Sequence, residues 1–159
     1  MAISFVVTTY NIAPYLGRCL DSVAQVALGG DQIVLVDDGS TDDSVEILSQ
    51  FAQHPPQGVE VTLILLGTNT IGGVGIGGNI GLTAATRDTV FFVDGDDWIN
   101  AEGFRRARAQ WVLQTYDIML TNYLEFDEAA GKDKSPADQY RWSGLRHSDD
   151  IATQRQQAL

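Results

Sequence analysis

Apolar and polar positions follow two different periods along the chain. Short runs that are rich in β-branched and aromatic residues, and apolar on both faces, are typical of parallel strands covered by helices on both sides. They predict strands over residues 3–10, 32–37, 59–66, 89–94 and 116–124. Between these runs, apolar residues recur at helical spacing. That spacing predicts helices over residues 13–26, 41–52, 75–86 and 101–114.

Strands and helices that alternate in this way predict an α/β fold. We expect a doubly wound, mostly parallel sheet with right-handed crossovers and with helices on both faces. The alternation fades after residue 125. We therefore predict one folded domain over residues 1–125 and, over 126–159, either a polar tail or the start of a truncated second half.

The composition excludes some classes of binding partner and indicates where the protein is found. The net charge of −11 over 159 residues argues against binding to nucleic acid or to an anionic membrane surface. No apolar run is long enough to span a membrane and no leader-like segment precedes the first strand, so we expect a cytoplasmic protein. The only cysteine, Cys19, falls in the apolar stripe of a predicted helix, which indicates a core position. His54 and His147 have no further His or Cys at ligand spacing, so a zinc site has little support.

Candidate chemistry lies where the predicted strands end, because open α/β sheets bind ligands beyond the carboxyl ends of their strands. The first strand ends in the sequence TTYN, the second in DDGSTD and the fourth in DGDDW. These ends would bring hydroxyls, an aromatic ring and two groups of carboxylates to one edge of the sheet. Asp42 and Asp43, late in the first of these acidic groups, are expected only to start the helix that follows.

The sharper acidic group consists of Asp94, Asp96 and Asp97. Like charges so close together repel one another unless a cation lies among them. Carboxylates select hard divalent ions, so the sequence predicts a site for Mn²⁺ or Mg²⁺ after the fourth strand. The alternative is a turn that uses one or two of these carboxylates for local hydrogen bonds.

A glycine-rich run over residues 70–82 contains G-x-G-x-x-G at Gly73, Gly75 and Gly78. With an acidic residue, Asp94, further along, this is the pattern of an NAD-binding Rossmann domain. The run follows the third predicted strand, however, and six residues separate that strand from Gly73, whereas a Rossmann glycine turn follows the first strand almost directly. We keep NAD binding as a minor alternative. We expect instead that the glycines bring the start of the third helix close to the ligand site.

Four motifs occur in a familiar order: FVVTTYNIAPYLGRCLDSV, LVDDGSTDDS, IGGVGIGGNIGLTAATRDTVFFVDGDDW and YDIMLTNYLEFDEAAGK. With them the chain resembles the N-terminal, nucleotide-sugar-binding half of a family 2 glycosyltransferase with the GT-A, Rossmann-like fold. The resemblance implies an enzyme that moves a sugar from a nucleoside diphosphate donor, with a UDP-sugar favoured, to an acceptor hydroxyl. It also implies dependence on a divalent metal and inversion of configuration. Residues 1–125 would be the donor-binding domain.

The resemblance also implies roles for residues at the first two strand ends. Thr8 and Tyr10 would line the nucleotide pocket, with Tyr10 beside the base. Asp38 would accept a hydrogen bond from the edge of the base, with Asp37 beside it.

At the fourth strand end, Asp94 and Asp96 match the family's Asp-x-Asp motif, which contacts the ribose and holds the metal, and Asp97 would share that duty. The family's catalytic base comes from an acceptor-binding half that lies further along than this chain extends. Asp149 and Asp150 are weak candidates for that base.

The implied acceptors are saccharides or lipid-linked carriers, as in polysaccharide biosynthesis, and such acceptors are compatible with a position at the inner face of a membrane. An apolar patch left by a missing acceptor half would be open to self-association into a homo-oligomer. The family commonly has a basic or other large polar residue where this chain has Gly78. The alternative of another class is a truncated or degenerate nucleotide-binding module, which would bind nucleotide without turnover.

Overall fold

The computed structural model describes residues 1–113, 118–119, 126–127 and 131–133. The chain divides into two compact units, Met1–Arg105 and Arg106–Leu159. Most of the predicted strand over 116–124 lies outside the described residues, as does the predicted domain boundary at residue 125.

The first unit is built on a parallel sheet of four strands. They are β1 (Ile3–Thr9), β2 (Gln32–Asp37), β3 (Glu60–Leu65) and β4 (Thr89–Asp94), in the spatial order β3-β2-β1-β4. All three strand pairs are parallel. Each strand lies within one residue of the bounds expected from the apolar runs, so the predicted α/β fold with a parallel sheet is confirmed.

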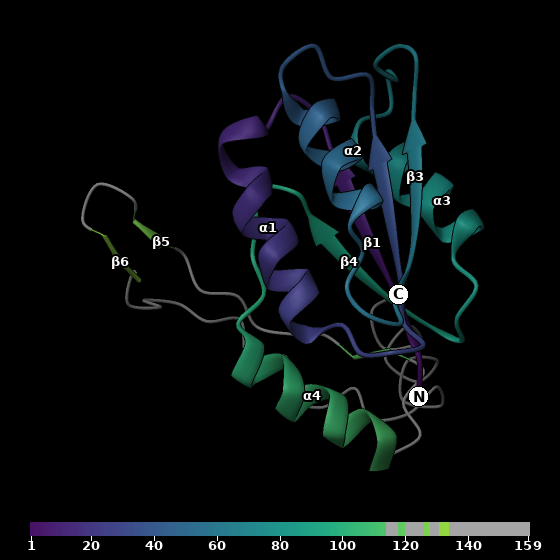
Figure 1. Ribbon diagram of the computed structural model, residues 1–159, viewed down its shortest axis with the longest axis vertical. Helices are drawn as coiled ribbons and strands as arrows, with labels where there is room; N and C mark the ends of the chain where they lie inside the picture. The colour runs from purple at the N-terminus through teal and green to yellow at the C-terminus, as the bar shows by residue number, and fades with distance from the viewer. Residues whose placement is uncertain (114–117, 120–125, 128–130, 134–159) are drawn as a thin grey trace, which may run out of the picture. The chain divides into compact units, whose positions relative to one another are not determined.

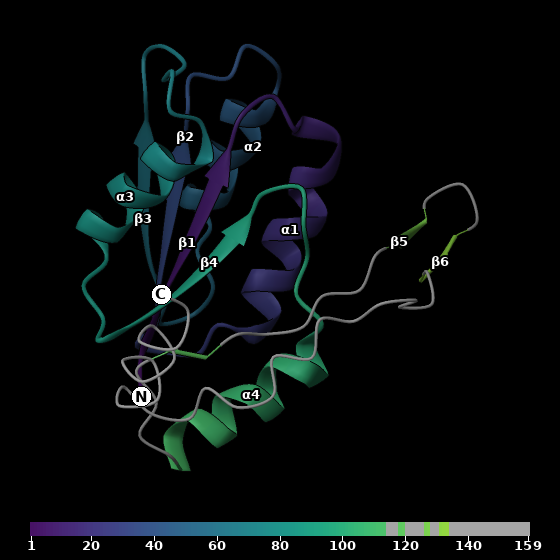
Figure 2. The ribbon, with the colours of Figure 1, turned by 180° about the vertical axis from the view of Figure 1, so that it is seen from behind.

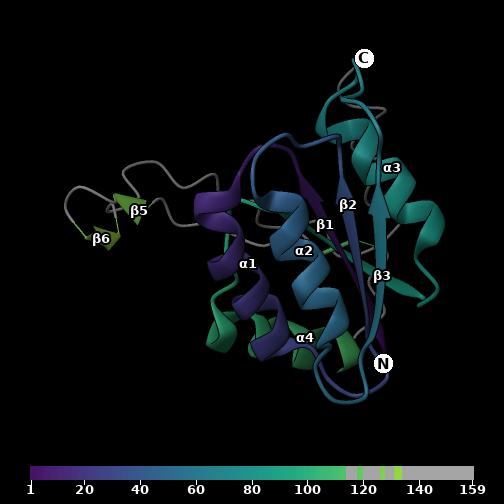
Figure 3. The same ribbon diagram turned by 45° about the horizontal axis from the view of Figure 1, so that its top comes forward.

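Helices cover both faces of this sheet. The helices α1 (Ala13–Val26) and α2 (Ser44–Gln53) lie on one face, and α3 (Val74–Ala84) lies on the other (Figures 1 and 3). Figure 2, seen from behind, brings α3 to the front of the sheet. A fourth helix, α4 (Ala101–Leu113), begins in the first unit. Within the described part of the chain, none of the helices combines the length and the apolar character that crossing a membrane requires.

Alternate side chains of the strands build two apolar clusters, one on each face. Phe5 and Val7 of β1 belong to the larger cluster, which includes residues of α1 and α2, whereas Val6 packs on the side of α3. Cys19 is fully buried in the larger cluster, as expected from its place in the apolar stripe. Phe104, in the first turn of α4, packs its ring 5.5 Å from that of Phe5.

The glycines of α3 allow the helix to lie directly on the sheet. A Cβ added at Gly77 would be 3.3 Å from Thr8 Cγ2, and one added at Gly81 would overlap Val6 Cγ1. At Gly75 an added Cβ would meet nothing within 4 Å, and at Gly78 it would be 3.8 Å from Phe92, an ordinary contact. Close packing of α3 on the sheet therefore depends on Gly77 and Gly81, which are not glycines of the G-x-G-x-x-G pattern. This observation weighs against the Rossmann interpretation, in which the third glycine of the pattern serves helix–sheet packing.

The described part of the second unit contains one short antiparallel pair. Strand β5 (Phe126–Asp127) pairs with β6 (Lys132–Asp133), and Gly131 between them has a positive φ of 62°. The sequence pattern did not predict this pair, since the segment is polar and each strand has only two residues.

Candidate functional site

The sheet order places the three predicted strand ends side by side. Strand β1 lies between β2 and β4, with Thr9 in register with Asp37 and Thr8 in register with Asp94. The chain leaves β1 toward one face of the sheet, whereas α3, which leads into β4, covers the other face. The gap between β1 and β4 is thus the topological switch point, where open α/β sheets bind their ligands.

Asp37, the last residue of β2, is fully buried. Its carboxylate accepts hydrogen bonds from Thr9 Oγ1 at 3.0 Å, from Ser40 N at 2.8 Å and from Ser40 Oγ at 2.5 Å. A buried carboxylate needs such partners, because an unpaired one would be strongly unfavourable. Asp37 therefore ties the loop after β2 to the end of β1, and its contact with a donor stays a prediction.

Asn11, which sequence reasoning did not single out, connects the same two loops. It has a left-handed φ of 51°, and its backbone N donates to Ser40 Oγ at 2.9 Å. Its Oδ1 accepts from Thr41 N at 2.8 Å and from Asp42 N at 3.4 Å. Asn is one of the few residues that enter the left-handed region readily, which is the signal that the sequence TTYN offered. Tyr10, next to it, is 46% exposed at this edge, and its contact with a base stays a prediction.

Asp42 does more than the predicted starting of the second helix. Its Oδ1 accepts from Ser44 N and its Oδ2 from Ala13 N, both at 3.0 Å, so it caps α2 and α1 together. Hydrogen bonds from the Ser44 side chain and the Ala13 backbone hold the pKa of Asp42 below its usual value. Asp43, at the N-cap of α2, makes no side-chain capping hydrogen bond, so of its expected role only the negative charge at the start of the helix remains.

Asp38 is only 6% exposed and is held by the loop between β3 and α3. Its carboxylate accepts from Thr70 N at 2.8 Å, from Thr70 Oγ1 at 3.0 Å and from Asn69 Nδ2 at 3.1 Å. The loop approaches so closely that a Cβ on Gly39 would lie 2.5 Å from Asn69 N. Sequence reasoning missed both partners, because nothing local links residues about thirty positions apart.

The acidic loop after β4 is fixed by its backbone and leaves its side chains open. Gly95 N donates to Thr8 O, and Asp97 N donates to Asp94 O, each at 2.9 Å. A Cβ on Gly95 would lie 2.5 Å from Ile12 Cδ1, so only glycine fits between the first two carboxylates of this motif. Asp94, Asp96 and Asp97 are all exposed.

These carboxylates influence one another and the core beneath them. Partial burial, and then the charges of Asp96 and Asp94, raise the pKa of Asp97. Burial, followed by the charges of the three carboxylates, raises the pKa of the Cys19 thiol to about 12. Among the described residues, no group of three or more His, Cys, Asp or Glu side chains is arranged to hold a metal. Exposed hard oxygen donors still fit an ion that takes one or two carboxylates and completes its shell with phosphate oxygens.

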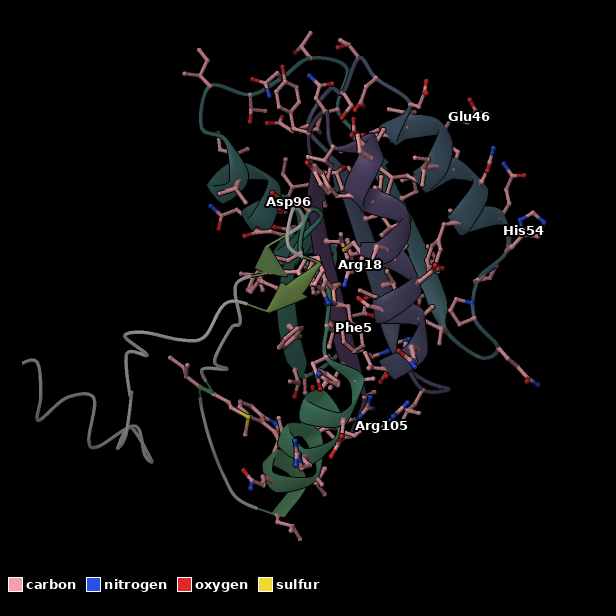
Figure 4. The ribbon with its side chains drawn as sticks, turned by 90° about the vertical axis from the view of Figure 1, so that its left-hand side faces the viewer. Phe5, Arg18, Glu46, His54, Asp96 and Arg105 are labelled. Atoms are coloured by element: carbon pink, nitrogen blue, oxygen red, sulfur yellow. The ribbon has the colours of Figure 1, made fainter. Side chains whose placement is uncertain are left out.

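Beside the acidic loop, Trp98 is covered on one face by a cation. The guanidinium carbon of Arg18, on α1, lies 3.2 Å from the centroid of the Trp98 ring, which is 36% exposed. Figure 4 shows Arg18 on α1 and Asp96 in the loop after β4. The stacked guanidinium leaves at most one face of this ring open to a sugar.

The structure thus brings Thr8, Tyr10, Asp38 and the three carboxylates after β4 to one edge of the sheet. Asp149 and Asp150, the candidates for a catalytic base, lie outside the described residues.

Comparison with known proteins assigns the family. The glycosyl transferase family 2 profile matches residues 4–156 of this chain. The chain therefore belongs to glycosyl transferase family 2, as its motifs predicted.

Three relatives illustrate the likeness. Glycosyltransferase GlyA of Streptococcus pneumoniae is 34% identical over 129 residues, which are 81% of this chain and 18% of GlyA. The crystal structure of S. aureus TarS 1–349 in complex with UDP-GlcNAc matches at 33% identity with a TM-score of 0.62, covering 72% of this chain and 32% of that one. The mannosyltransferase PcManGT from Pyrobaculum calidifontis, in complex with GDP-Man and Mn²⁺, matches at 26% identity with a TM-score of 0.61, covering 69% of this chain and 32% of that one. The chain thus spans less than a third of the length of each of these relatives.

Proposed function

We propose that this chain carries the donor site of a glycosyltransferase that transfers a sugar from a UDP-sugar to an acceptor hydroxyl. One observation carries the proposal: Thr8, Asp38 and the loop that begins at Asp94 lie at the carboxyl ends of three neighbouring strands, around the switch point of a family 2 sheet. The relative TarS, which shares this fold at 33% identity, was solved with UDP-GlcNAc, and this favours uridine as the base. PcManGT was solved with GDP-Man, so the choice of base needs a direct test.

The roles proposed for the side chains combine the family resemblance with the place and the exposure of each side chain. Tyr10 is exposed and stacks on the base, and Thr8 lines the pocket between β1 and β4. Asp38 accepts a hydrogen bond from the edge of the base. Asp37 is buried and fully engaged with Thr9 and Ser40, so its contribution to donor binding is to hold the loop that carries Asp38.

Asp94 contacts the ribose, and one or two carboxylates of the set Asp94, Asp96 and Asp97 hold Mn²⁺ or Mg²⁺ on the diphosphate, whose oxygens complete the shell of the ion. Bound there, a divalent ion supplies charge stabilisation for the departing diphosphate. The exposed carboxylates supply the negative charge that holds the ion, and the backbone of Gly95 keeps them fixed against β1. Rigid placement matters because preorganised charges need no rearrangement as the leaving group develops its own charge.

Transfer with inversion requires the acceptor hydroxyl to attack the anomeric carbon from the face opposite the diphosphate, helped by a carboxylate base. Asp149 and Asp150 remain the candidates for that base. The proposed acceptors are saccharides or lipid-linked carriers. The relative TarS is named as a poly(ribitol-phosphate) β-N-acetylglucosaminyltransferase.

The direct test is turnover. UDP-hexoses are incubated with the protein and saccharide acceptors, with Mn²⁺, Mg²⁺ or EDTA, and release of UDP is followed together with the anomeric configuration of the product by NMR. Metal-dependent transfer with inversion supports the proposal. Nucleotide binding without transfer to any acceptor supports the alternative of a noncatalytic module.

Self-association is a separate proposal. Val74, Ile76 and Leu82 of α3 and Phe92 of β4 are exposed apolar side chains of the first unit. A homo-oligomer would remove part of this apolar area from water. Sedimentation equilibrium of the whole chain distinguishes a monomer from an oligomer.

A further inference from the structure

The carboxylate of Asp38 is nearly saturated by the protein itself. A carboxylate offers about four acceptor positions, two on each oxygen. Thr70 Oγ1 at 3.0 Å and Asn69 Nδ2 at 3.1 Å both donate to Oδ2, and Thr70 N donates to Oδ1 at 2.8 Å. One acceptor position, on Oδ1, is therefore left for a ligand.

Thr70 donates to both oxygens of the Asp38 carboxylate, through its backbone N and its Oγ1. These two bonds restrict the rotation of the carboxylate plane. Asn69 Nδ2 is a second donor to Oδ2, so the Thr70 hydroxyl and the Asn69 amide together define the direction of that oxygen while Thr70 N holds Oδ1. The loop that carries Thr70 continues directly from β3, where Leu66 N donates to Asp37 O at 2.9 Å. The same loop lies against Gly39, whose φ of 76° and lack of a side chain permit the contact.

A fixed carboxylate with one open acceptor position discriminates between bases. Uracil carries a hydrogen on N3, and cytosine has a lone pair there, so a carboxylate can accept from the first and repels the second. Because Asp38 is 6% exposed, neither water nor a second orientation easily replaces the missing donor. A site with a buried polar group rejects a ligand that leaves the group unpaired.

We propose that Thr70 is a positioning residue for the donor base: it orients the Asp38 carboxylate so that its remaining acceptor position meets the N3–H of uracil. The inference rests on the proposed function, since it assumes that Asp38 meets the base of the donor. It adds a specificity role for the loop between β3 and α3 that acts through Asp38, without contact between the Thr70 hydroxyl and the nucleotide.

The test compares two substitutions at the same position. Thr70→Val keeps the branched shape and the backbone donor but removes the hydroxyl, and Thr70→Ser keeps the hydroxyl. Thr83→Val is the matched control, because the Thr83 hydroxyl donates to Asn79 O at 2.9 Å within α3 and does not touch Asp38. Dissociation constants for UDP and for CDP are measured by calorimetry on the whole chain with excess Mn²⁺, beside the thermal unfolding midpoint of each variant.

We expect Thr70→Val to bind UDP on the order of tenfold more weakly, because the Asp38 carboxylate then loses one of the two donors to Oδ2 and turns away from the orientation that meets the N3–H of uracil, with little change for CDP. The preference for UDP over CDP therefore falls by about the same factor, a change that general destabilisation would not produce. Thr70→Ser and Thr83→Val should keep the preference of the wild type. If Thr70→Val does not fold, Thr70→Ala, which removes the same hydroxyl without adding a methyl group beside the carboxylate, is measured instead.

Two results would overturn the inference. One is a hydroxyl-free variant that retains the wild-type preference for UDP over CDP. The other is an equal loss of affinity for both nucleotides, which would make Thr70 a structural residue only. Failure of the proposed function looks different, because wild-type protein would then bind neither nucleotide in the presence of metal. A wild type that binds UDP and CDP equally would refute the base-reading role of Asp38 and this inference with it.

Discussion

Thr8 and Asp94 lie opposite each other on the neighbouring parallel strands β1 and β4, at the point where both strands end. The next residue, Gly95, donates its backbone N–H to Thr8 O at 2.9 Å and so continues the ladder of the sheet by one step. The proposed metal-binding loop is thereby attached to the strand that carries the proposed nucleotide pocket. Changes at Gly95 should affect folding and donor binding together.

Gly95→Ala should be clearly destabilising. The new methyl group would lie 2.5 Å from Ile12 Cδ1, 2.7 Å from Thr9 Cγ2 and 2.8 Å from Thr8 O, so the strand end or the loop must move. Overpacking of this kind costs about 1–3 kcal/mol in the free energy of unfolding, which urea denaturation measures.

The control for this substitution is Gly67→Ala, since a Cβ at Gly67 would meet nothing within 4 Å. It should change the free energy of unfolding by less than about 0.5 kcal/mol, or stabilise slightly. Equal effects at the two positions would show that Gly95 is not held against β1 in the way described.

Helix α3 offers a matched pair of glycines. Gly81→Ala would drive its methyl group into Val6, whereas at Gly75 the added methyl group meets nothing within 4 Å. Alanine favours a helix over glycine by up to about 1 kcal/mol, so Gly75→Ala should stabilise while Gly81→Ala destabilises by about 1–3 kcal/mol. Opposite signs in chemical denaturation are the expected result. If both variants gain stability, α3 does not pack on the sheet through Gly81.

Substitution of Asn11 should lower the free energy of unfolding for two reasons, the left-handed backbone at this position and the loss of the Oδ1 acceptor. Asn11→Ala loses the acceptor for Thr41 N and Asp42 N and places an alanine at a φ of 51°. We expect a loss of about 2 kcal/mol in the free energy of unfolding.

Two further variants separate these causes. Asn11→Gly relieves the backbone cost and should recover about 1 kcal/mol of that loss. Asn11→Asp keeps an oxygen at the position of Oδ1 and should retain more of the wild-type stability than Asn11→Ala does. If the alanine and glycine variants are equally stable, the left-handed conformation contributes nothing.

Acid should remove the contribution of Asp42. Its folded-state pKa is lowered from 3.8, so the charged form stabilises the fold above the unfolded pKa, and this stabilisation is lost as the pH falls through the folded value. The difference in stability between the wild type and Asp42→Asn should thus be full near neutral pH and shrink on acidification. Asp43→Asn is the neighbouring control for loss of a charge at this loop, because Asp43 makes no side-chain capping bond. A constant difference across the acid range would contradict the double-capping role.

The apolar periodicity predicted the strands of the parallel sheet and the helices because the pattern of each element is carried by consecutive residues. The start of α2 shows where local reasoning fails: the helix begins at Ser44 and not at residue 41, since Thr41 and Asp42 bind Asn11 of another loop. The strand-end argument found Asp38, but the partners that hold it, Asn69 and Thr70, come from a third loop. Such contacts depend on the order of strands in the sheet, which periodicity does not encode.

The spacing of Gly73, Gly75 and Gly78 matches a dinucleotide-binding pattern, but the glycines that let α3 pack on the sheet are Gly77 and Gly81. Which glycine faces the sheet depends on the rotation of α3 about its axis, and that rotation is set by Thr8 and Val6 beneath it. The resemblance supplied the family correctly, and the catalytic base stays a prediction at Asp149 and Asp150.

Thermal unfolding with UDP tests the donor site most directly. UDP at about a hundred times its dissociation constant should stabilise the protein by about 2.7 kcal/mol, a rise of several degrees in the unfolding midpoint, with Mn²⁺ or Mg²⁺ but not with EDTA. Asp96→Ala should abolish this rise, and Asp88→Ala, an exposed carboxylate at the other end of β4, should keep it. A rise with NAD in EDTA, or a UDP response that survives in Asp96→Ala, would contradict the assignment of this loop to a metal and a nucleotide sugar.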